Sequence, residues 1–255
     1  MNYRFYYPDW NSRKEVCKEY PQIKEITKEP IAFWFGVGPK RTIRKTKKSI
    51  QRLLKRADPY LPVLVIYSIP QRDLGHHSKG GADSVDEYLE FIQEFCNSLG
   101  DKSPIVIYEP DALPHTTLMS DFEAEWRIKL MKKGLETVTR SNAHVYIDIG
   151  HSNWLSPKEA HQLLEKVSNP NVRGFSVNVS NYRTTIESAK WANKICEHRP
   201  NDQYVIDTSR NGNGPHGNEW CNPPGRRIGE FPTTNMVNLL GSSPNERGVS
   251  AYQSR

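Results

Sequence analysis

The sequence predicts one α/β domain in which parallel strands alternate with helices. Short β-branched or aromatic runs recur along the chain, and the segments between them carry apolar residues at spacings of three and four, long enough for crossover helices. The length of 255 residues suits a single barrel of this class. No Pro/Ser-rich linker and no fixed-period repeat divides the chain, which favours one domain over two.

The apolar runs and the segments between them give the expected elements. Six runs are expected to form strands, in the order 31–35, 63–67, 105–108, 145–147, 174–177 and 204–206. Two intervening segments, 85–100 and 122–140, show clear helical spacing, and the first ends in Gly100, a common helix stop.

Segment 40–56 holds nine of the 35 Lys and Arg residues and no acid, and it accounts for the net charge of +6. Ile43, Ile50 and Leu54 recur there at helical spacing, so we expect an amphipathic helix that buries these three and leaves the cations in solvent. A nucleic-acid patch is the weaker alternative, because no aromatic residues are interleaved for base stacking.

The composition narrows the class of protein further. Six Trp, twelve Tyr and eight Phe argue against a disordered chain. No window approaches the ~20 apolar residues of a membrane span, and the start, "MNYRFYYPDW", lacks the layout of a signal peptide. We expect a soluble domain without a membrane partner, and export stays open. The four cysteines form no C-x-x-C pair, so the redox compartment stays open as well.

Polar, aromatic and glycine residues follow the C-terminal end of every predicted strand. The first strand is closed by Trp34 and Gly36; the others run into "YSIPQRD", "YEPD", "DIGHSNW", "NVSNY" and "DTSRNGNG". In parallel α/β barrels the active site is built from the loops at these strand ends. The six segments are therefore expected to meet in one pocket.

Asp73 and Asp111 are the candidates for acid chemistry in that pocket. Each comes a few residues after a predicted strand and close to a proline. A carboxyl that donates a proton near neutral pH needs a raised pKa, which burial or a neighbouring carboxylate provides. We interpret the two as a coupled pair; the alternative for either one alone is a helix cap or a turn residue.

A third group of side chains, Asp148, His151 and Trp154, suits the recognition of sugars. Polar side chains hold sugar hydroxyls, while the apolar ring face stacks on an aromatic side chain. Trp34, Trp154 and Trp220 are candidate platforms, with a place in the core as the alternative for each.

Three other chemistries are disfavoured. The adjacent His76 and His77 cannot both face one metal ion from regular structure, and no third ligand has suitable spacing. The stretch "NGNGPHG" lacks the spacing of a phosphate-binding loop, and no G-x-S-x-G elbow occurs. We expect neither a metal nor a cofactor.

Six ordered blocks resemble a known family: "AFWFG", "VLVIYSIPQRDLGHHSKGGA", "VIYEPDAL", "VYIDIGHSNWL", "GFSVNVSNY" and "VIDTSRNGNGPHGNEWCNPPGRRIG". Spread over residues 5–235, they resemble glycoside hydrolase family 6, the inverting β-1,4-glucanases and cellobiohydrolases. The resemblance implies a single-domain α/β fold, a distorted parallel (β/α) barrel of about seven strands, with completeness at the C-terminus left open.

The resemblance also implies residue roles. Asp111 matches the general acid, and Asp73 matches the aspartate that raises the acid's pKa and assists the base step through water. Tyr67 matches the tyrosine beside the distorted sugar, and Arg72 and Ser78 belong to the same mobile loop. The remaining substrate-binding matches are Trp34, Asp148, His151, Trp154, Asn178, Asn181, Asp207 and Trp220. Inversion places a water between carboxyls typically ~6.5–9.5 Å apart.

The C-terminal segment departs from the family pattern. The family continues with Leu-Trp-Ile-Lys and Pro-Gly-Glu-Ser-Asp-Gly, whose Asp is the other proposed base. Here "FPTTNMVNLLGSSPNERGVSAYQSR" keeps Pro244 and Glu246 but lacks the Trp, the Lys and that Asp. We therefore assign residues 1–235 to the catalytic domain and residues 236–255 to a divergent tail. A truncated or frameshifted product, a different closing strand, a weakly cleaving glucan binder and a frayed tail stay open.

The cysteines depart as well. A family disulfide beside Asp73 would start where this chain has Leu74. Cys221 matches half of a second disulfide, so we expect a thiol unless one of the other three cysteines pairs with it.

The sequence thus predicts a monomeric, endo-acting, inverting β-1,4-glucan hydrolase of the cellulase type, extracellular by resemblance. Its partner would be a β-1,4-glucan polysaccharide or oligosaccharide, without nucleic acid. Endo action is favoured because the segment after Asp73 is short and the C-terminal loop that would help to roof a tunnel is missing. A weakly active or inactive glucan-binding protein is the alternative, because the C-terminal block is altered.

Overall fold

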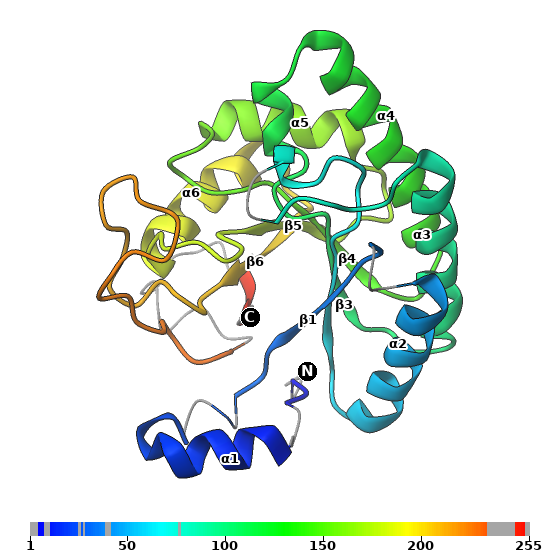
Figure 1. Ribbon diagram of the computed structural model, residues 1–255. Coiled ribbons are helices and arrows are strands. Elements are labelled where there is room, and N and C mark those ends of the chain that lie inside the picture. Colours follow the sequence, from blue (N-terminus) through cyan, green and yellow to red (C-terminus); the bar gives the residue numbers. More distant parts are fainter. Residues whose placement is uncertain are drawn as a thin grey trace.

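Seven parallel strands form one sheet in sequential order, β1 to β7 (Figure 1). The computed structural model describes residues 5–7, 11–24, 27, 29–38, 42–75, 78–233 and 248–252. The strands are β1 (Ala32–Phe35), β2 (Val63–Ile66), β3 (Ile105–Tyr108), β4 (His144–Asp148), β5 (Gly174–Val177), β6 (Gln203–Asp207) and β7 (Gly248–Tyr252). The six strands expected from the sequence are confirmed, with ends that differ by one residue at most.

Helices cover the outer side of the sheet (Figure 1). They are α1 (Asn11–Glu19), α2 (Ile43–Ala57), α3 (Val85–Leu99), α4 (Asp121–Val138), α5 (Pro157–Val167) and α6 (Thr185–His198), with short 3-10 turns η1 (Pro21–Ile23), η3 (Asp73–Gly75) and η4 (Pro114–Leu118). Successive helices from α2 to α6 pack against one another, whereas α1 lies apart at the bottom of Figure 1. This alternation of strands and helices confirms the predicted α/β fold.

Side-chain caps fix where the helices begin. Ser120 and Ser156 each accept a hydrogen bond from the backbone N–H three residues on, and Glu123 and Glu159 return a bond to the cap. The caps place the loops before α4 and α5 in a defined conformation. Gly100 ends α3 with φ of 59°, in the left-handed region that glycine adopts easily, as its position in the sequence predicted.

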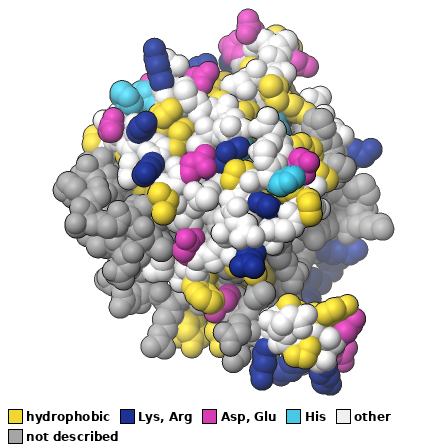
Figure 2. All heavy atoms as spheres, turned by 90° about the vertical axis from the view of Figure 1, so that its left-hand side faces the viewer, with side chains coloured by type: hydrophobic (Ala, Val, Ile, Leu, Met, Phe, Trp, Pro, Cys, Tyr) yellow, Lys and Arg dark blue, Asp and Glu magenta, His cyan; other side chains and the backbone are white. Residues whose placement is uncertain are grey.

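Residues 43–56 of the basic segment lie in α2, and the helix buries the side that their spacing predicted. Ile50 and Leu54 lie in the core, and Ile43 is half-buried against it. Lys47 reaches over to α3 and forms an ion pair with Glu94 at 2.6 Å. The cationic side of α2 is thus a helix surface that is partly paired with α3. Figure 2 views the molecule from the side of Figure 1 opposite to α2, and on that face basic side chains are interspersed with acidic and hydrophobic ones.

The central strands are buried on both faces. Leu64 and Ile66 of β2 pack under the helices, whereas Val63 and Val65 point to the other side, into a smaller cluster with Ile107 of β3. Strands covered on both faces read as continuous apolar runs rather than as alternating ones. This double layer holds the strand ends rigid, so the loops that follow them keep fixed relative positions.

A core substitution in β2 should destabilise the whole domain. Leu64 has no exposed surface, so we expect Leu64→Ala to lower the free energy of unfolding by about 2–5 kcal/mol through lost burial and a residual cavity. Ile186, which is 50% exposed, provides the control, since Ile186→Ala should change stability by less than about 0.5 kcal/mol. Urea unfolding followed by circular dichroism measures both. Equal effects of the two substitutions would contradict this core assignment.

The sheet is extended by residues that the sequence placed in the divergent tail. Strand β7 pairs in parallel with β6, from Tyr204 opposite Gly248 to Asp207 opposite Tyr252, and reaches the predicted number of about seven strands. Within the described residues no backbone pairing joins β1 to β7, so the barrel is not closed by a strand pair there. Pro244 and Glu246 lie outside the described residues.

Two sequence expectations concern the cysteines and the membrane. All four cysteines are described, and none of them forms a disulfide with another. Cys221 is therefore an exposed thiol that is not joined to any of the other three cysteines. No helix in the part of the chain that the structure describes is long and apolar enough to cross a bilayer.

Candidate active site

The loops after β1 to β6 surround one cleft of about 1300 Å³. The convergence of the strand ends that the sequence predicted is therefore confirmed. Ten of the predicted site residues line the cleft, namely Trp34, Tyr67, Arg72, Asp73, Ser78, Asp111, His151, Trp154, Asn181 and Trp220. The other three, Asp148, Asn178 and Asp207, have no exposed surface and lie beneath the loops.

Asp111 is placed in the cleft by the backbone conformation of the segment after β3. Its φ of 65° lies in the left-handed region, and its N–H donates to Oδ1 of Asp148 at 2.9 Å. Burial, and then the negative charges of Asp148 and Asp73, raise the pKa of Asp111 well above its ordinary value. Asp111 can therefore hold a proton at a pH where an exposed aspartate has lost it.

Asp148 is the anchor of Asp111. Besides the N–H of Asp111, its carboxylate accepts hydrogen bonds from the N–H of Gly150 at 3.1 Å and from Oγ of Ser176 at 2.9 Å. Burial raises the pKa of Asp148 to about 7, against the lowering effect of these donors. Because the side chain is committed to these contacts, its position indicates a supporting role, and the sugar contact implied by the resemblance stays a prediction.

The loop after β2 presents Asp73 in a strained conformation. Gln71, Asp73 and Leu74 all have positive φ, at 54°, 57° and 46°. Oδ2 of Asp73 accepts a hydrogen bond from the N–H of Ser78 at 2.7 Å, and the guanidinium of Arg72 donates to the carbonyls of Tyr67 and Ser78 at 2.7 Å each. Arg72 thus ties the two ends of the loop together.

Tyr67 lies between the two aspartates and the aromatic wall of the cleft. Its ring meets that of Trp34 edge to face at 5.1 Å between centroids, and Arg72 lies over the ring at 4.4 Å. Burial, followed by the charges of Asp111 and Asp73, raises the pKa of Tyr67. Its hydroxyl stays protonated and can donate a hydrogen bond toward a bound group or a carboxylate.

A second aromatic wall comes from the loop after β4. The Trp154 ring lies 5.7 Å from the ring of His151 and 5.0 Å from that of His115. Burial, and then the positive charge of Arg183, lower the pKa of His151 to about 4, so its imidazole is neutral at ordinary pH. Nδ1 of His151 is buried without a hydrogen-bond partner among the described residues. The ring itself lines the cleft, where a neutral imidazole can form hydrogen bonds with polar groups of a ligand.

Asn178 and Asp207 fasten the neighbouring loops from below. Nδ2 of Asn178 donates to the carbonyl of Asp207 at 2.8 Å, and its Oδ1 accepts from the N–H of Arg183 at 3.0 Å. The carboxylate of Asp207 accepts from the N–H groups of Ser180 at 2.6 Å and Ser209 at 2.8 Å. These contacts place Asn181 and Arg183 at the cleft; direct sugar contacts of Asn178 and Asp207 stay predictions.

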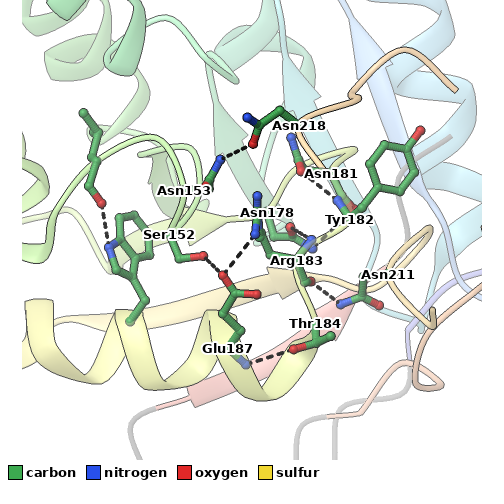
Figure 3. Close-up of polar contacts among 12 residues, drawn as sticks. Ser152, Asn153, Asn178, Asn181, Tyr182, Arg183, Thr184, Glu187, Asn211 and Asn218 are labelled. Atoms are coloured by element: carbon green, nitrogen blue, oxygen red, sulfur yellow. Dashed lines mark hydrogen bonds and ion pairs between the residues drawn. The ribbon is translucent and has the colours of Figure 1, made fainter. Parts of the chain in front are cut away.

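Arg183 is a cleft residue that the sequence reasoning missed (Figure 3). Its guanidinium lies 3.6 Å from Oε1 of Glu187, which also accepts a hydrogen bond from Ser152, and its carbonyl accepts from Nδ2 of Asn211 at 3.0 Å. The side chain is only 15% exposed, so it is held at the wall. The block "NVSNY" carries the signal, since the residue directly after it in the strand-end loop is this arginine.

No metal centre emerges from the residues that the structure describes. No group of three His, Cys, Asp or Glu side chains there is arranged to hold an ion. His76 and His77, the pair considered in the sequence, lie outside the described residues.

Trp220 is 53% exposed at the edge of the cleft, where a flat aromatic face is open to a ligand.

A parallel α/β fold whose cleft joins an aspartate pair to aromatic faces is typical of glycoside hydrolases. The model of one such family, "Glycosyl hydrolases family 6", matches residues 9–242. The chain belongs to this family.

Curated relatives and solved structures agree with this family. The chain is 39% identical to "Endoglucanase 1" of Streptomyces sp. (strain KSM-9), covering 91% of this chain and 64% of the relative. It is 37% identical to "Endoglucanase A" of Cellulomonas fimi, covering 82% of this chain and 46% of that relative. The chain thus spans less than two thirds of each.

A solved structure is also similar over the full chain. The endoglucanase Cel6 of Mycobacterium tuberculosis, in complex with methyl-cellobiosyl-4-deoxy-4-thio-β-D-cellobioside, superposes with a TM-score of 0.88 at 29% identity. The match covers 100% of this chain and 87% of that one. The agreement shows that the arrangement of strands and loops described above is that of the family.

Proposed function

We propose that this protein hydrolyses β-1,4-glucosidic bonds in cellulose or a related β-glucan, with inversion at the anomeric carbon. The observation that carries the proposal is Asp111, a carboxyl of raised pKa that shares one cleft with Asp73 and with aromatic platforms. Such a pair supplies the acid and the water-activating group that glycoside hydrolysis needs.

The proposed reaction starts with the proton on Asp111. Asp111 gives this proton to the glycosidic oxygen as the bond from that oxygen to the anomeric carbon breaks. A water attacks the same carbon from the opposite face, and its proton passes through a second water to Asp73. The step leaves Asp111 ionised and Asp73 protonated, and exchange with solvent restores both.

The walls of the cleft suit a glucan chain. Trp34 and Trp154 offer faces for sugar rings, and Tyr67 lies beside the aspartates, where the reacting sugar must be distorted. The neutral His151 can donate and accept hydrogen bonds to sugar hydroxyls. Trp220 would extend the path at an open edge, in keeping with endo action.

A reducing-sugar assay on carboxymethyl cellulose, paired with affinity electrophoresis in the same polymer, tests the proposal. We expect retarded migration together with product release. Retardation without product would favour the alternative, a weakly active or inactive glucan-binding protein, for which the altered C-terminal block of the sequence is the reason. Neither retardation nor product would contradict both.

Arg183 is expected to contribute to substrate binding. We expect Arg183→Met to raise KM about 10-fold with a smaller effect on kcat, because a hydrogen bond from a charged group is worth about 1.5–3 kcal/mol. The same variant should raise the pKa of His151 in NMR titration, since burial remains but the Arg183 charge that lowers this pKa is gone. Lys190→Met, an exposed change on α6, is the control. An unchanged KM would contradict the role.

A further inference from the structure

Glu109 is a buried carboxyl that the proposed proton transfers do not use. It follows β3, two residues before Asp111, and has no exposed surface. Its position in the sequence suggests a brace for Asp111, but its side chain contacts the neighbouring loop instead. Oε2 accepts hydrogen bonds from the N–H groups of Ser68 at 3.0 Å and Ile69 at 3.1 Å. These two residues begin the loop that carries Asp73.

The same loop is held a second time, from α4. Arg127 is 1% exposed, and its Nη2 donates to the carbonyls of Pro70 at 3.2 Å and Gln71 at 3.1 Å. Burial lowers the pKa of Arg127, and the nearby charge of Glu109 is the main effect that opposes this lowering. The loop is therefore fixed through its N–H groups by Glu109 and through its carbonyls by Arg127, and the negative charge of Glu109 favours the charged form of Arg127.

Buried hydroxyls lie next to Glu109. Tyr88 of α3 is near enough to Glu109 to influence its pKa, and the Tyr88 hydroxyl lies 2.7 Å from that of Tyr108. The Tyr108 hydroxyl donates in turn to the carbonyl of Met131 at 2.8 Å. Gly134 makes room for this chain, because a Cβ atom there would lie 2.5 Å from the Tyr108 hydroxyl.

We propose that Glu109 is a positioning residue that sets the loop of Asp73 relative to Asp111. Glu109 and Asp111 share one short backbone segment. The hydrogen bonds from the loop after β2 to Glu109 therefore fix the position of Asp73 relative to Asp111. The loop needs such a support, because three non-glycine residues, Gln71, Asp73 and Leu74, keep left-handed conformations in it. This role rests on the proposed function, in which both aspartates act on one bond.

Two substitutions at Glu109 remove its hydrogen-bond acceptors to different extents. Glu109→Gln keeps one carbonyl oxygen as an acceptor, whereas Glu109→Ala keeps none. We expect kcat on soluble β-glucan to fall about 10-fold and about 100-fold respectively, with KM within about twofold, because a misplacement of about 1 Å can cost a factor of that size. Glu94→Gln on α3 is the control. It removes the carboxylate that pairs with Lys47 of α2, and it should leave kcat unchanged.

Amide hydrogen exchange measured by mass spectrometry reports how firmly the loop is held, independently of activity. Residues 68–75 should exchange faster in Glu109→Ala than in the parent, with an intermediate rate in Glu109→Gln and no change in Glu94→Gln. Should the alanine variant not fold, the glutamine variant carries the same comparison. Parent-like exchange and kcat in a folded variant would overturn the role. An inactive parent would instead count against the proposed function, and the exchange rates would still decide whether Glu109 holds the loop.

Discussion

Replacing Asp111 with asparagine is expected to lower kcat on soluble β-glucan by about 10³-fold while KM changes little. The amide is nearly the same size and can occupy the same place, but it has no acidic proton to give to the glycosidic oxygen. The backbone N–H of residue 111 would still reach Asp148, so the fold should be kept. Asp101→Asn, at an exposed turn, is the control.

A substrate with a good leaving group sharpens this test. An aryl cellobioside whose phenol is strongly acidic needs no proton on its leaving oxygen, so Asp111→Asn should lose much less activity on it than on β-glucan. Steady-state kinetics on both substrates give the comparison. Parent-like hydrolysis of β-glucan by the variant, or an equal loss on both substrates, would contradict the role of general acid.

Replacing Asp73 with asparagine is expected to lower kcat by about 10²-fold, because the water that attacks the anomeric carbon then loses its proton acceptor. The variant should also change the pH dependence. Activity requires protonated Asp111 and falls as the pH rises through its pKa, and the negative charge of Asp73 helps to raise that pKa. Removing the charge lowers the pKa, so the alkaline limb of kcat/KM should move to lower pH.

Asp148→Asn provides the comparison for this shift. The charge of Asp148 raises the pKa of Asp111 more than that of Asp73 does, and the amide oxygen can still accept the N–H of Asp111. We expect the alkaline limb to move further down in pH than in Asp73→Asn, with a smaller loss of kcat at low pH. Profiles of kcat/KM against pH for the three proteins test both expectations, and an upward movement in either variant would be inconsistent with the assigned charges.

The strands could be predicted because burial on both faces leaves a direct mark on the sequence. The apolar run from Val63 to Ile66 is continuous for this reason, and the polar residues of this segment come after the strand has ended. The ends of β4 and β6 extend one residue beyond the predicted runs, to Asp148 and Asp207, since backbone pairing continues after the apolar residues stop.

The division of labour among the polar residues could not be predicted in this way. Asp111 and Asp148 both follow apolar strands, and only the three-dimensional structure shows that one lines the cleft while the other lies under it. Glu109 adjoins Asp111 in sequence but bonds to the loop of Asp73, a contact between residues about 40 positions apart. Side-chain direction at a strand end depends on the local φ, which is positive at both Glu109 and Asp111.

The configuration of the first product formed from a soluble cello-oligosaccharide tests the proposed mechanism most directly. Proton NMR recorded before mutarotation distinguishes the two anomers at the new reducing end. Attack by water from the face opposite to the leaving group, assisted by Asp73 and by the acid Asp111, predicts that the α-anomer appears first. Initial accumulation of the β-anomer would mean retention through a covalent intermediate, and it would contradict the roles assigned to this pair.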